Sequence, residues 1–173
     1  MISTKEDLKN IIALEEKGYG RSSLIRRYLR ELRICEYYKN CAGGGTTRLL
    51  FKLHNFYRNR LGLRLGFEIP LNVFGKGLHI FHTGNIIINE TSSVGEYCNI
   101  IGLGSKDGGN GPTIGNHCEL GMNSVVIGNV KIGNNVYIGA GAVVTKSFEQ
   151  NGVSLAGVPA KIVASRKDSK KAD

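Results

Sequence analysis

The chain has 173 residues, a length that supports one principal hydrophobic core. It contains no run of roughly 18 or more apolar residues and no basic-then-apolar leader, so we expect a cytoplasmic protein without a membrane-spanning helix or signal peptide. The formal net charge of +9 is concentrated in residues 1–66, where 14 Lys/Arg and 6 Asp/Glu give +8. This basic region is a solvated helical face, a surface for docking a partner, or a peripheral contact with the anionic inner face of a membrane. It carries no recognised nucleic-acid-binding motif, so we expect no nucleic-acid partner.

The first 65 residues predict three helices. Residues 3–18 begin with a Ser-Thr pair that can cap a helix and end at a glycine. Residues 22–39 place apolar side chains along one side and four arginines, including Arg33, around the other. Residues 46–60 carry a third apolar set, which consists of Leu49, Leu50, Leu53, Phe56 and Tyr57. We therefore expect residues 1–65 to form a basic α-helical N-terminal region.

Residues 66–165 show a period of six. The apolar residues that keep this spacing are Ile88, Val94 and Ile100, and then Ile114, Leu120, Val126, Ile132, Ile138 and Val144. Neither the helical period of 3.6 nor the strand period of 2.0 generates this pattern. A six-residue unit is a short strand plus a turn, and three units close one triangular coil. We therefore predict a mainly β fold, a parallel β-helix of about four coils, with a closing segment at 153–165 and a flexible tail at 166–173.

The six-residue period is not kept at two places in the sequence, which are the start of the repeat region and residues 103–113. Followed backwards from Ile100, it reaches His82, Lys76 and Pro70, which are not typical interior residues. It also breaks at 103–113, and we expect this glycine-rich segment to leave the coil as a loop. The four cysteines show no CxxC spacing and are expected to be reduced structural thiols.

His82 is the main candidate for a catalytic residue. An imidazole titrates near neutral pH, which suits the removal of a proton from a hydroxyl group. A hydrogen-bonded structural histidine is the alternative. His79, His82 and His117 could also bind zinc between subunits, but the sequence has no HxxxxH pair, so we expect no metal.

Two segments carry a resemblance to a known family: residues 66–82 (GFEIPLNVFGKGLHIFH) and 156–161 (AGVPAK). Together with the repeats between them, they resemble the serine acetyltransferase-like hexapeptide-repeat acyltransferases. The resemblance implies a left-handed β-helix and a homotrimer with active sites between adjacent subunits. It also implies that His82 is the general base of a direct acetyl transfer from acetyl-CoA to a hydroxyl group. The implied cofactor-binding residues are Gly121, Gly139, Ala140 and Lys161.

The chain departs from serine acetyltransferases at two residues near this site. Phe81 precedes His82 where those enzymes carry an aspartate, and Gly111 stands where they carry a second histidine. The chain resembles instead a shorter branch associated with bacterial surface polysaccharides, so we expect the acceptor to be a sugar of a capsule or other surface glycan. Candidate substrate contacts are Glu68, Lys106 and Asp107. The alternatives are a serine O-acetyltransferase of cysteine biosynthesis, an antibiotic acetyltransferase that uses the same histidine, and a non-catalytic trimeric scaffold.

Overall fold

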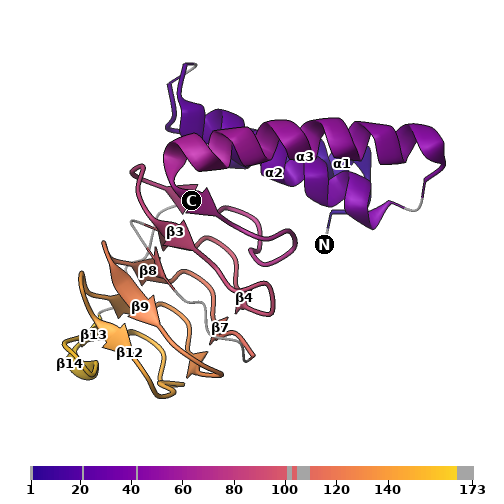
Figure 1. The fold of residues 1–173 in the computed structure, drawn as a ribbon. Coiled ribbons are helices and arrows are strands. Elements are labelled where there is room, and N and C mark those ends of the chain that lie inside the picture. The colour runs from indigo at the N-terminus through magenta and orange to yellow at the C-terminus, as the bar shows by residue number, and fades with distance from the viewer. Residues whose placement is uncertain (1, 21, 42, 101–102, 105–109, 167–173) are drawn as a thin grey trace.

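Three helices lie at one end of a parallel β-helix (Figure 1). This arrangement is seen in a computed structural model, which describes residues 2–20, 22–41, 43–100, 103–104 and 110–166. The longest helix crosses the end of the β-helix, and the C-terminal strands lie at the opposite end (Figure 1). The molecule is therefore a stack of coils with a helical layer on its first coil.

The helices are α1 (Lys5–Glu15), α2 (Leu24–Asn40) and α3 (Gly45–Leu65). Thr4 caps α1 through a capping box with Asp7, and the Ser23 side chain accepts a hydrogen bond from the first turn of α2. α3 runs five residues beyond the predicted end and stops at Gly66, whose φ of +78° is the left-handed conformation that glycine adopts readily. The sequence therefore predicted the three helices, with boundaries shifted by a few residues.

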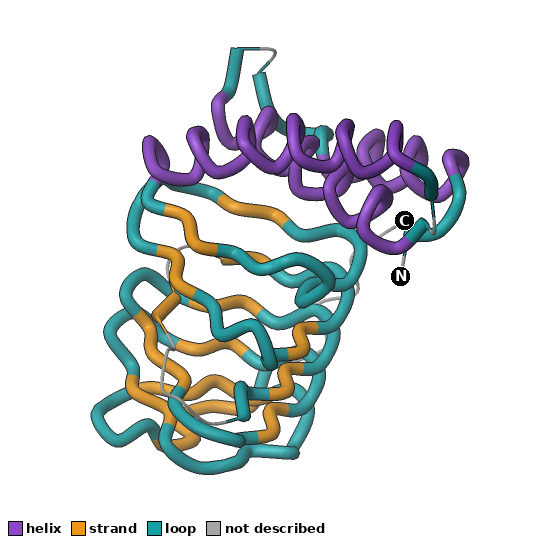
Figure 2. The backbone as a smooth tube through the Cα atoms, turned by 45° about the vertical axis from the view of Figure 1, so that its right-hand side comes forward, coloured by secondary structure: helices purple, strands orange, loops and turns teal. Residues whose placement is uncertain are grey.

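Short strands form three sheets along the β-helix (Figure 2). Sheet A consists of β1 (Phe67–Glu68), β3 (Ile86–Ile87), β6 (Leu103–Gly104), β9 (Ser124–Val126) and β12 (Val143–Val144). Sheet B consists of β4 (Ser93–Val94), β7 (Thr113–Ile114) and β10 (Lys131–Ile132). Sheet C consists of β2 (His79–Ile80), β5 (Asn99–Ile100), β8 (Glu119–Leu120), β11 (Tyr137–Ile138), β13 (Val153–Ala156) and β14 (Lys161–Ser165).

The chain visits sheets A, B and C in turn, and strands of successive coils pair in parallel. Single bridges from Phe74 to Val94 and from Ile132 to Phe148 extend sheet B at both ends. Five strands stack in sheet A, so about four turns separate the first strand from the last. This confirms the predicted β-helix of about four coils with helices before it.

The predicted repeat residues fill the interior of the β-helix. Those from Ile100 to Val144 that lie on the six-residue beat are all buried, and Cys98, Cys118 and Ala142 are fully buried in the smaller interior position. All four cysteines are free thiols. The period of six is therefore the spacing between interior residues on successive sheets.

The backward extension of the frame was wrong in the first coil. Ile80 pairs with Ile100 and is fully buried, whereas His82, two residues later, is exposed. Paired residues lie 20 positions apart between β2 and β5 but 18 apart between β8 and β11. Two additional residues enlarge the turn after Ile80, and a constant period cannot detect them. The interior positions of the first coil are therefore Phe74 and Ile80, not Lys76 and His82.

The predicted loop at 103–113 overlaps two strands. β6 ends at Gly104 and β7 begins at Thr113, so the segment outside the strands is shorter than predicted. Lys106 and Asp107 lie outside the described residues, as do residues 167–173.

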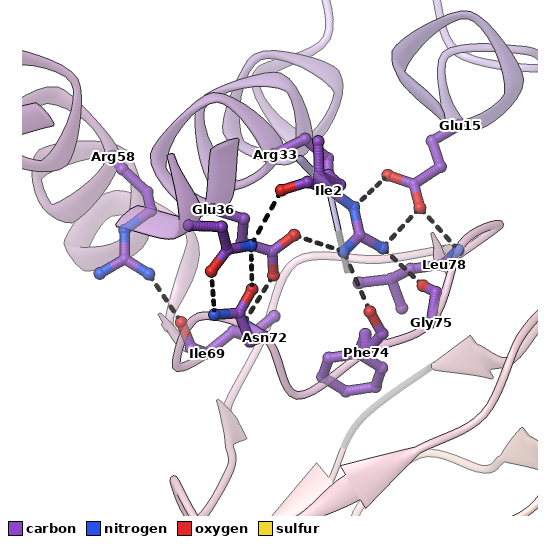
Figure 3. Close-up of polar contacts among 11 residues, drawn as sticks. Ile2, Glu15, Arg33, Glu36, Arg58, Ile69, Asn72, Phe74, Gly75 and Leu78 are labelled. Carbon is purple, nitrogen blue, oxygen red and sulfur yellow. Dashed lines mark hydrogen bonds and ion pairs between the residues drawn. The ribbon is translucent and has the colours of Figure 1, made fainter. Parts of the chain in front are cut away.

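The open edge of the first coil is covered by polar side chains from the helical layer (Figure 3). The backbone groups that they bond belong to Ile69, Asn72, Phe74, Gly75, Leu78 and Ile80. The side chains, which we call the polar cap, are Glu15, Tyr19, Arg33, Glu36 and Arg58. An uncovered strand edge would leave these N–H and C=O groups without protein partners, so the cap takes the place of a further coil.

Arg33 is the centre of the polar cap. Its guanidinium donates to Glu15 at 2.6 and 2.9 Å, to Glu36 at 2.7 Å, and to the carbonyl groups of Phe74 at 3.0 Å and Gly75 at 2.6 Å (Figure 3). Burial disfavours the cation, but the hydrogen bonds and charges of the two carboxylates outweigh it and raise the pKa of Arg33. The sequence interpretation placed Arg33 on the solvent side of its helix. That interpretation was wrong, because Arg33 is only 1% exposed.

Candidate functional site

Four of the predicted site residues lie on one edge of the β-helix, where the chain turns from sheet C to sheet A. We call this edge the C–A corner and define it by residues 81–85, 121–123 and 139–142. His82 lies in the first of these turns. The other three residues at the corner are Gly121, Gly139 and Ala140. Residues far apart in the sequence thus form one column, because each coil repeats the same path.

His82 is exposed directly after β2. Its ring lies 6.5 Å from the ring of Phe81, which is itself 46% exposed. The enlarged turn is held by a 3.0 Å hydrogen bond from the backbone N–H of Gly84 to the carbonyl group of Leu65, the last residue of α3. The imidazole therefore projects from a backbone that the helical layer fixes, and it is accessible to a ligand.

Tyr19 supports this turn, and sequence reasoning missed it. Its hydroxyl donates to the Ile80 carbonyl oxygen at 2.7 Å and accepts from the Ile80 N–H at 2.8 Å. Its ring stacks on His79 at 4.7 Å, and His79 meets Phe81 edge to face at 4.6 Å. Three aromatic rings therefore position the strand end that precedes His82. No sequence signal links Tyr19 to a residue 61 positions away.

Close packing between successive coils explains why glycine occupies two positions of the C–A corner. A Cβ atom on Gly121 would lie 2.6 Å from the backbone nitrogen of Ala140 in the next coil, and one on Gly139 would lie 3.2 Å from the Leu155 carbonyl oxygen. Gly121 and Gly139 are buried, whereas Ala140 is exposed. At these three positions the corner therefore carries only backbone and a methyl group, so a ligand can approach it more closely there than beside the exposed side chains of Phe81 and Met122.

Lys161 and Glu68 lie apart from His82 in the fold. Lys161 begins β14 and pairs with Ala156 at the far end of sheet C. Glu68 is exposed on β1 in sheet A, pairs with Ile87, and lines a cleft of about 370 Å³ beside Arg58. Lys161 therefore lies at the end of the β-helix opposite His82, and Glu68 lies on the face next to the C–A corner.

A larger cleft, of about 820 Å³, lies between α1 and sheet B. Its lining includes Asp7, Lys17, Lys76 and Tyr97, but none of the predicted site residues that the structure describes. Because its lining comes from the helices and from the first coils, we interpret this cleft as a gap left where the helical layer packs on the β-helix. We therefore place the candidate site at the C–A corner.

Gly111 occupies a position without room for a side chain. A Cβ atom there would lie 2.4 Å from the Ser92 hydroxyl oxygen and 2.6 Å from the Ser92 backbone nitrogen. The Gly111 N–H also donates to the Thr91 hydroxyl at 2.6 Å. The backbone of this segment therefore lies directly against the preceding coil, and a histidine at this position would require the segment to move.

Of the three histidines that could have formed a zinc site, His79 and His82 lie on either side of Phe81, whereas His117 lies at another turn. His117 stacks on Tyr97 at 5.2 Å, at the turn between sheets B and C. Within residues 2–20, 22–41, 43–100, 103–104 and 110–166, no group of three or more His, Cys, Asp or Glu side chains could hold a metal ion.

The fold is a parallel β-helix whose interior residues recur with a period of six. Residues 111–146 match the family described as bacterial transferase hexapeptide (six repeats). The chain is 36% identical over 108 residues to a serine acetyltransferase of Synechococcus elongatus, covering 58% of this chain and 44% of that protein. It is 33% identical over 128 residues to a serine acetyltransferase of Staphylococcus epidermidis, covering 64% of this chain and 60% of that protein. The chain thus spans less than two thirds of the length of these relatives.

A solved structure gives the same assignment of the fold. The serine acetyltransferase of Brucella abortus in complex with coenzyme A superposes with a TM-score of 0.69 at 22% identity, covering 92% of this chain and 67% of that one. The expected β-helix with N-terminal helices is therefore the fold of serine acetyltransferase structures.

Proposed function

We propose that the chain is an acetyl-CoA-dependent O-acetyltransferase that uses His82 as its general base. The observation that carries this proposal is the exposed imidazole of His82 at a corner that also contains Gly121, Gly139 and Ala140. The similarity to serine acetyltransferases supports it, and one such protein of the same fold binds coenzyme A. Acetyl-CoA would lie along the C–A corner with Lys161 near its phosphates.

In the proposed reaction, the His82 imidazole takes the proton of the acceptor hydroxyl as its oxygen attacks the thioester carbonyl carbon. Backbone N–H groups at the corner stabilise the negative charge on the carbonyl oxygen. The carbon–sulfur bond then breaks, and the CoA thiolate receives the proton from the imidazolium. An acetyl ester and CoA with a free thiol are the products, and no covalent acetyl-enzyme forms.

We further propose a homotrimer with active sites between adjacent subunits. Phe81 is 46% exposed and Met122 is 50% exposed, and both lie on the C–A corner. A neighbouring copy that packed beside this corner would cover these apolar side chains and supply the second wall of a groove. His82 would then lie between two chains instead of on an open surface.

L-Serine is the acceptor that the comparisons favour, since the relatives described above are named serine acetyltransferases. This reading assigns the chain to the first step of making an activated serine derivative. It is the reading that our sequence analysis gave as the alternative.

A sugar hydroxyl of a surface polysaccharide is the second candidate acceptor, and two local features favour it. Phe81 presents an apolar ring beside His82 where the serine acetyltransferase pattern has a carboxylate, and such a ring can pack on the C–H face of a sugar. Gly111 leaves no space for the second histidine of that pattern. A lipid-linked sugar would also explain a basic N-terminal region that contacts a membrane.

CoA thiol release from acetyl-CoA tests the proposal. The wild type, His82→Ala and the matched control His117→Ala are assayed with L-serine and with a panel of sugars and nucleotide-sugars. We expect turnover with one acceptor class, a loss of at least about 100-fold in His82→Ala, and little change in His117→Ala. Turnover that survives in His82→Ala would overturn the assigned base. A protein that binds no acetyl-CoA and transfers no acetyl group would be the trimeric scaffold instead.

A further inference from the structure

α3 is apolar on two opposite sides. One side carries Leu61 and Leu65, which are buried in the core, and α3 contacts α2 and β1. The other side is exposed although it is rich in large apolar residues. Their exposed fractions are 58% for Leu49, 58% for Leu53, 63% for Phe56 and 87% for Leu63.

These four residues share one face of the helix. Their spacing of four, three and seven residues brings them to the same side at 3.6 residues per turn. We call this set the α3 outer face. It extends over about 20 Å of helix at 1.5 Å per residue. Figure 1 shows α3 along the margin of the molecule, with the coils on its other side.

Only basic charges border the α3 outer face on its own helix. Arg48, Lys52, Arg60 and Arg64 are all exposed, and α3 contains no Asp or Glu. The Arg60 guanidinium lies 5.7 Å from the centre of the Phe56 ring, so one of these cations rests on the apolar face itself. Arg58, the other basic residue of α3, points inward and donates to the Ile69 carbonyl oxygen at 2.8 Å (Figure 3).

This combination of apolar and basic groups favours an anionic lipid bilayer over a second copy of the chain as the partner of the α3 outer face. A second copy placed with its own α3 against this face would oppose arginines and lysines with no carboxylate on either helix, which is unfavourable. A bilayer of anionic lipids takes up the apolar side chains and neutralises the basic ones at the same time. None of the helices in the described part of the chain is long and apolar enough to cross a membrane, so the contact is peripheral.

We propose that the α3 outer face docks on an anionic lipid bilayer, with Leu49, Leu53, Phe56 and Leu63 in the interface and the basic residues at the phosphate groups. Long basic side chains can extend toward the head groups while their methylene stems stay beside the apolar ones. In a homotrimer with parallel β-helices, symmetry would bring all three α3 helices to the same end of the assembly. Simultaneous contact by three helices would then strengthen the binding.

The docking places the C–A corner near the membrane. Leu65 ends α3, and its carbonyl oxygen accepts the Gly84 N–H two residues after His82. On the proposed function, a lipid-linked acceptor would then reach His82 by extending past the C-terminal end of α3, over about the 10 Å diameter of a helix. Docking itself does not depend on acetyl transfer, so the two proposals fail separately.

Sedimentation with lipid vesicles tests the docking. The full-length protein is mixed with vesicles of phosphatidylcholine alone or with about a third of phosphatidylglycerol. We expect binding to the anionic vesicles that weakens as salt is added. Lys52→Gln is expected to weaken it about fivefold, and Leu53→Ser combined with Phe56→Ser at least about tenfold.

Two variants serve as matched controls. Lys131→Gln and Val163→Ser remove a similarly exposed cation and apolar side chain from the β-helix, and we expect each to change binding less than about twofold. Circular dichroism confirms that each variant is folded. Absence of binding to anionic vesicles overturns the proposal, as does equal weakening by the controls. A wild type that does not sediment but forms larger oligomers than the Leu53→Ser and Phe56→Ser variant would identify a second copy as the occupant and would also overturn it.

Discussion

The two ends of the β-helix are closed by different kinds of interaction. At the N-terminal end, side chains of the polar cap bond the backbone edge of the first coil. At the C-terminal end, β14 folds back antiparallel on β13, and backbone groups bond to backbone groups. The first end depends on individual side chains, whereas the second depends on the path of the chain. The same physical requirement, a covered strand edge, thus has two solutions of different sensitivity to substitution.

Among the substitutions considered, replacement of Arg33, the central side chain of the polar cap, is expected to destabilise the protein most. Arg33→Met leaves Glu15 and Glu36 buried without a cation and two carbonyl groups without a donor. We expect a loss of about 3–5 kcal/mol in the free energy of unfolding, measured by urea denaturation. Arg30→Met is the matched control, because Arg30 pairs with Glu16 at the surface and is expected to contribute less than about 1 kcal/mol. Equal losses in the two variants would contradict the assigned role of the cap.

Removal of the Tyr19 hydroxyl group tests the part of the polar cap that bonds Ile80, in the strand just before His82. Tyr19→Phe keeps the ring stack on His79 but leaves the N–H and C=O of Ile80 without their partner. We expect destabilisation by about 1–3 kcal/mol, the usual effect of an unsatisfied buried polar group. Urea denaturation at neutral pH measures it. Tyr57→Phe, on the exposed side of α3, should leave the stability unchanged.

The same hydroxyl predicts a dependence of stability on alkaline pH. Burial raises the pKa of Tyr19 from about 10 to about 12. Between these values the unfolded chain releases the proton while the folded chain keeps it, so the stabilisation is complete below pH 10 and is lost as the pH rises toward 12. We expect the difference in unfolding free energy between the wild type and Tyr19→Phe to shrink over this range. A difference that stays constant would show that Tyr19 ionises normally.

Substitution at the C-terminal end should have the smallest effect. Val163 lies on β14 with 62% of its surface exposed, and the pairing of β14 uses backbone groups. We expect Val163→Ser to change the free energy of unfolding by no more than about 0.5 kcal/mol. Thermal denaturation beside Arg33→Met gives the comparison directly. A large loss in Val163→Ser would mean that side chains close this end too.

The sequence predicted the β-helix because its interior is periodic. Residues such as Leu120 and Ile138 recur at a spacing that only a coil of three short strands explains, and both are fully buried. Gly121 and Gly139 fall beside them at the C–A corner for the same reason. The assignment of His82 came from the family resemblance, and its role stays a prediction.

The polar cap was not predictable from the same pattern. An arginine on an amphipathic helix is ordinarily assigned to solvent, and nothing local distinguishes Arg33 from Arg30. The difference arises because Arg33 lies beside the carbonyl groups of Phe74 and Gly75, whereas Arg30 pairs with Glu16 at the surface. The two additional residues after Ile80 were hidden as well, since an insertion shifts a frame without leaving its own signal.

Because the coils stack at a regular spacing, the number of coils fixes the distance between His82 and Gly139. His82 follows β2, Gly139 follows β11, and β5 and β8 lie between these two strands in sheet C. With parallel strands about 4.8 Å apart, three steps set a separation of about 14 Å along the β-helix. The number of coils thus sets the length that a ligand needs in order to contact both residues along the C–A corner. Deletion or duplication of one coil would change the measured length by about 4.8 Å while leaving both ends closed as before.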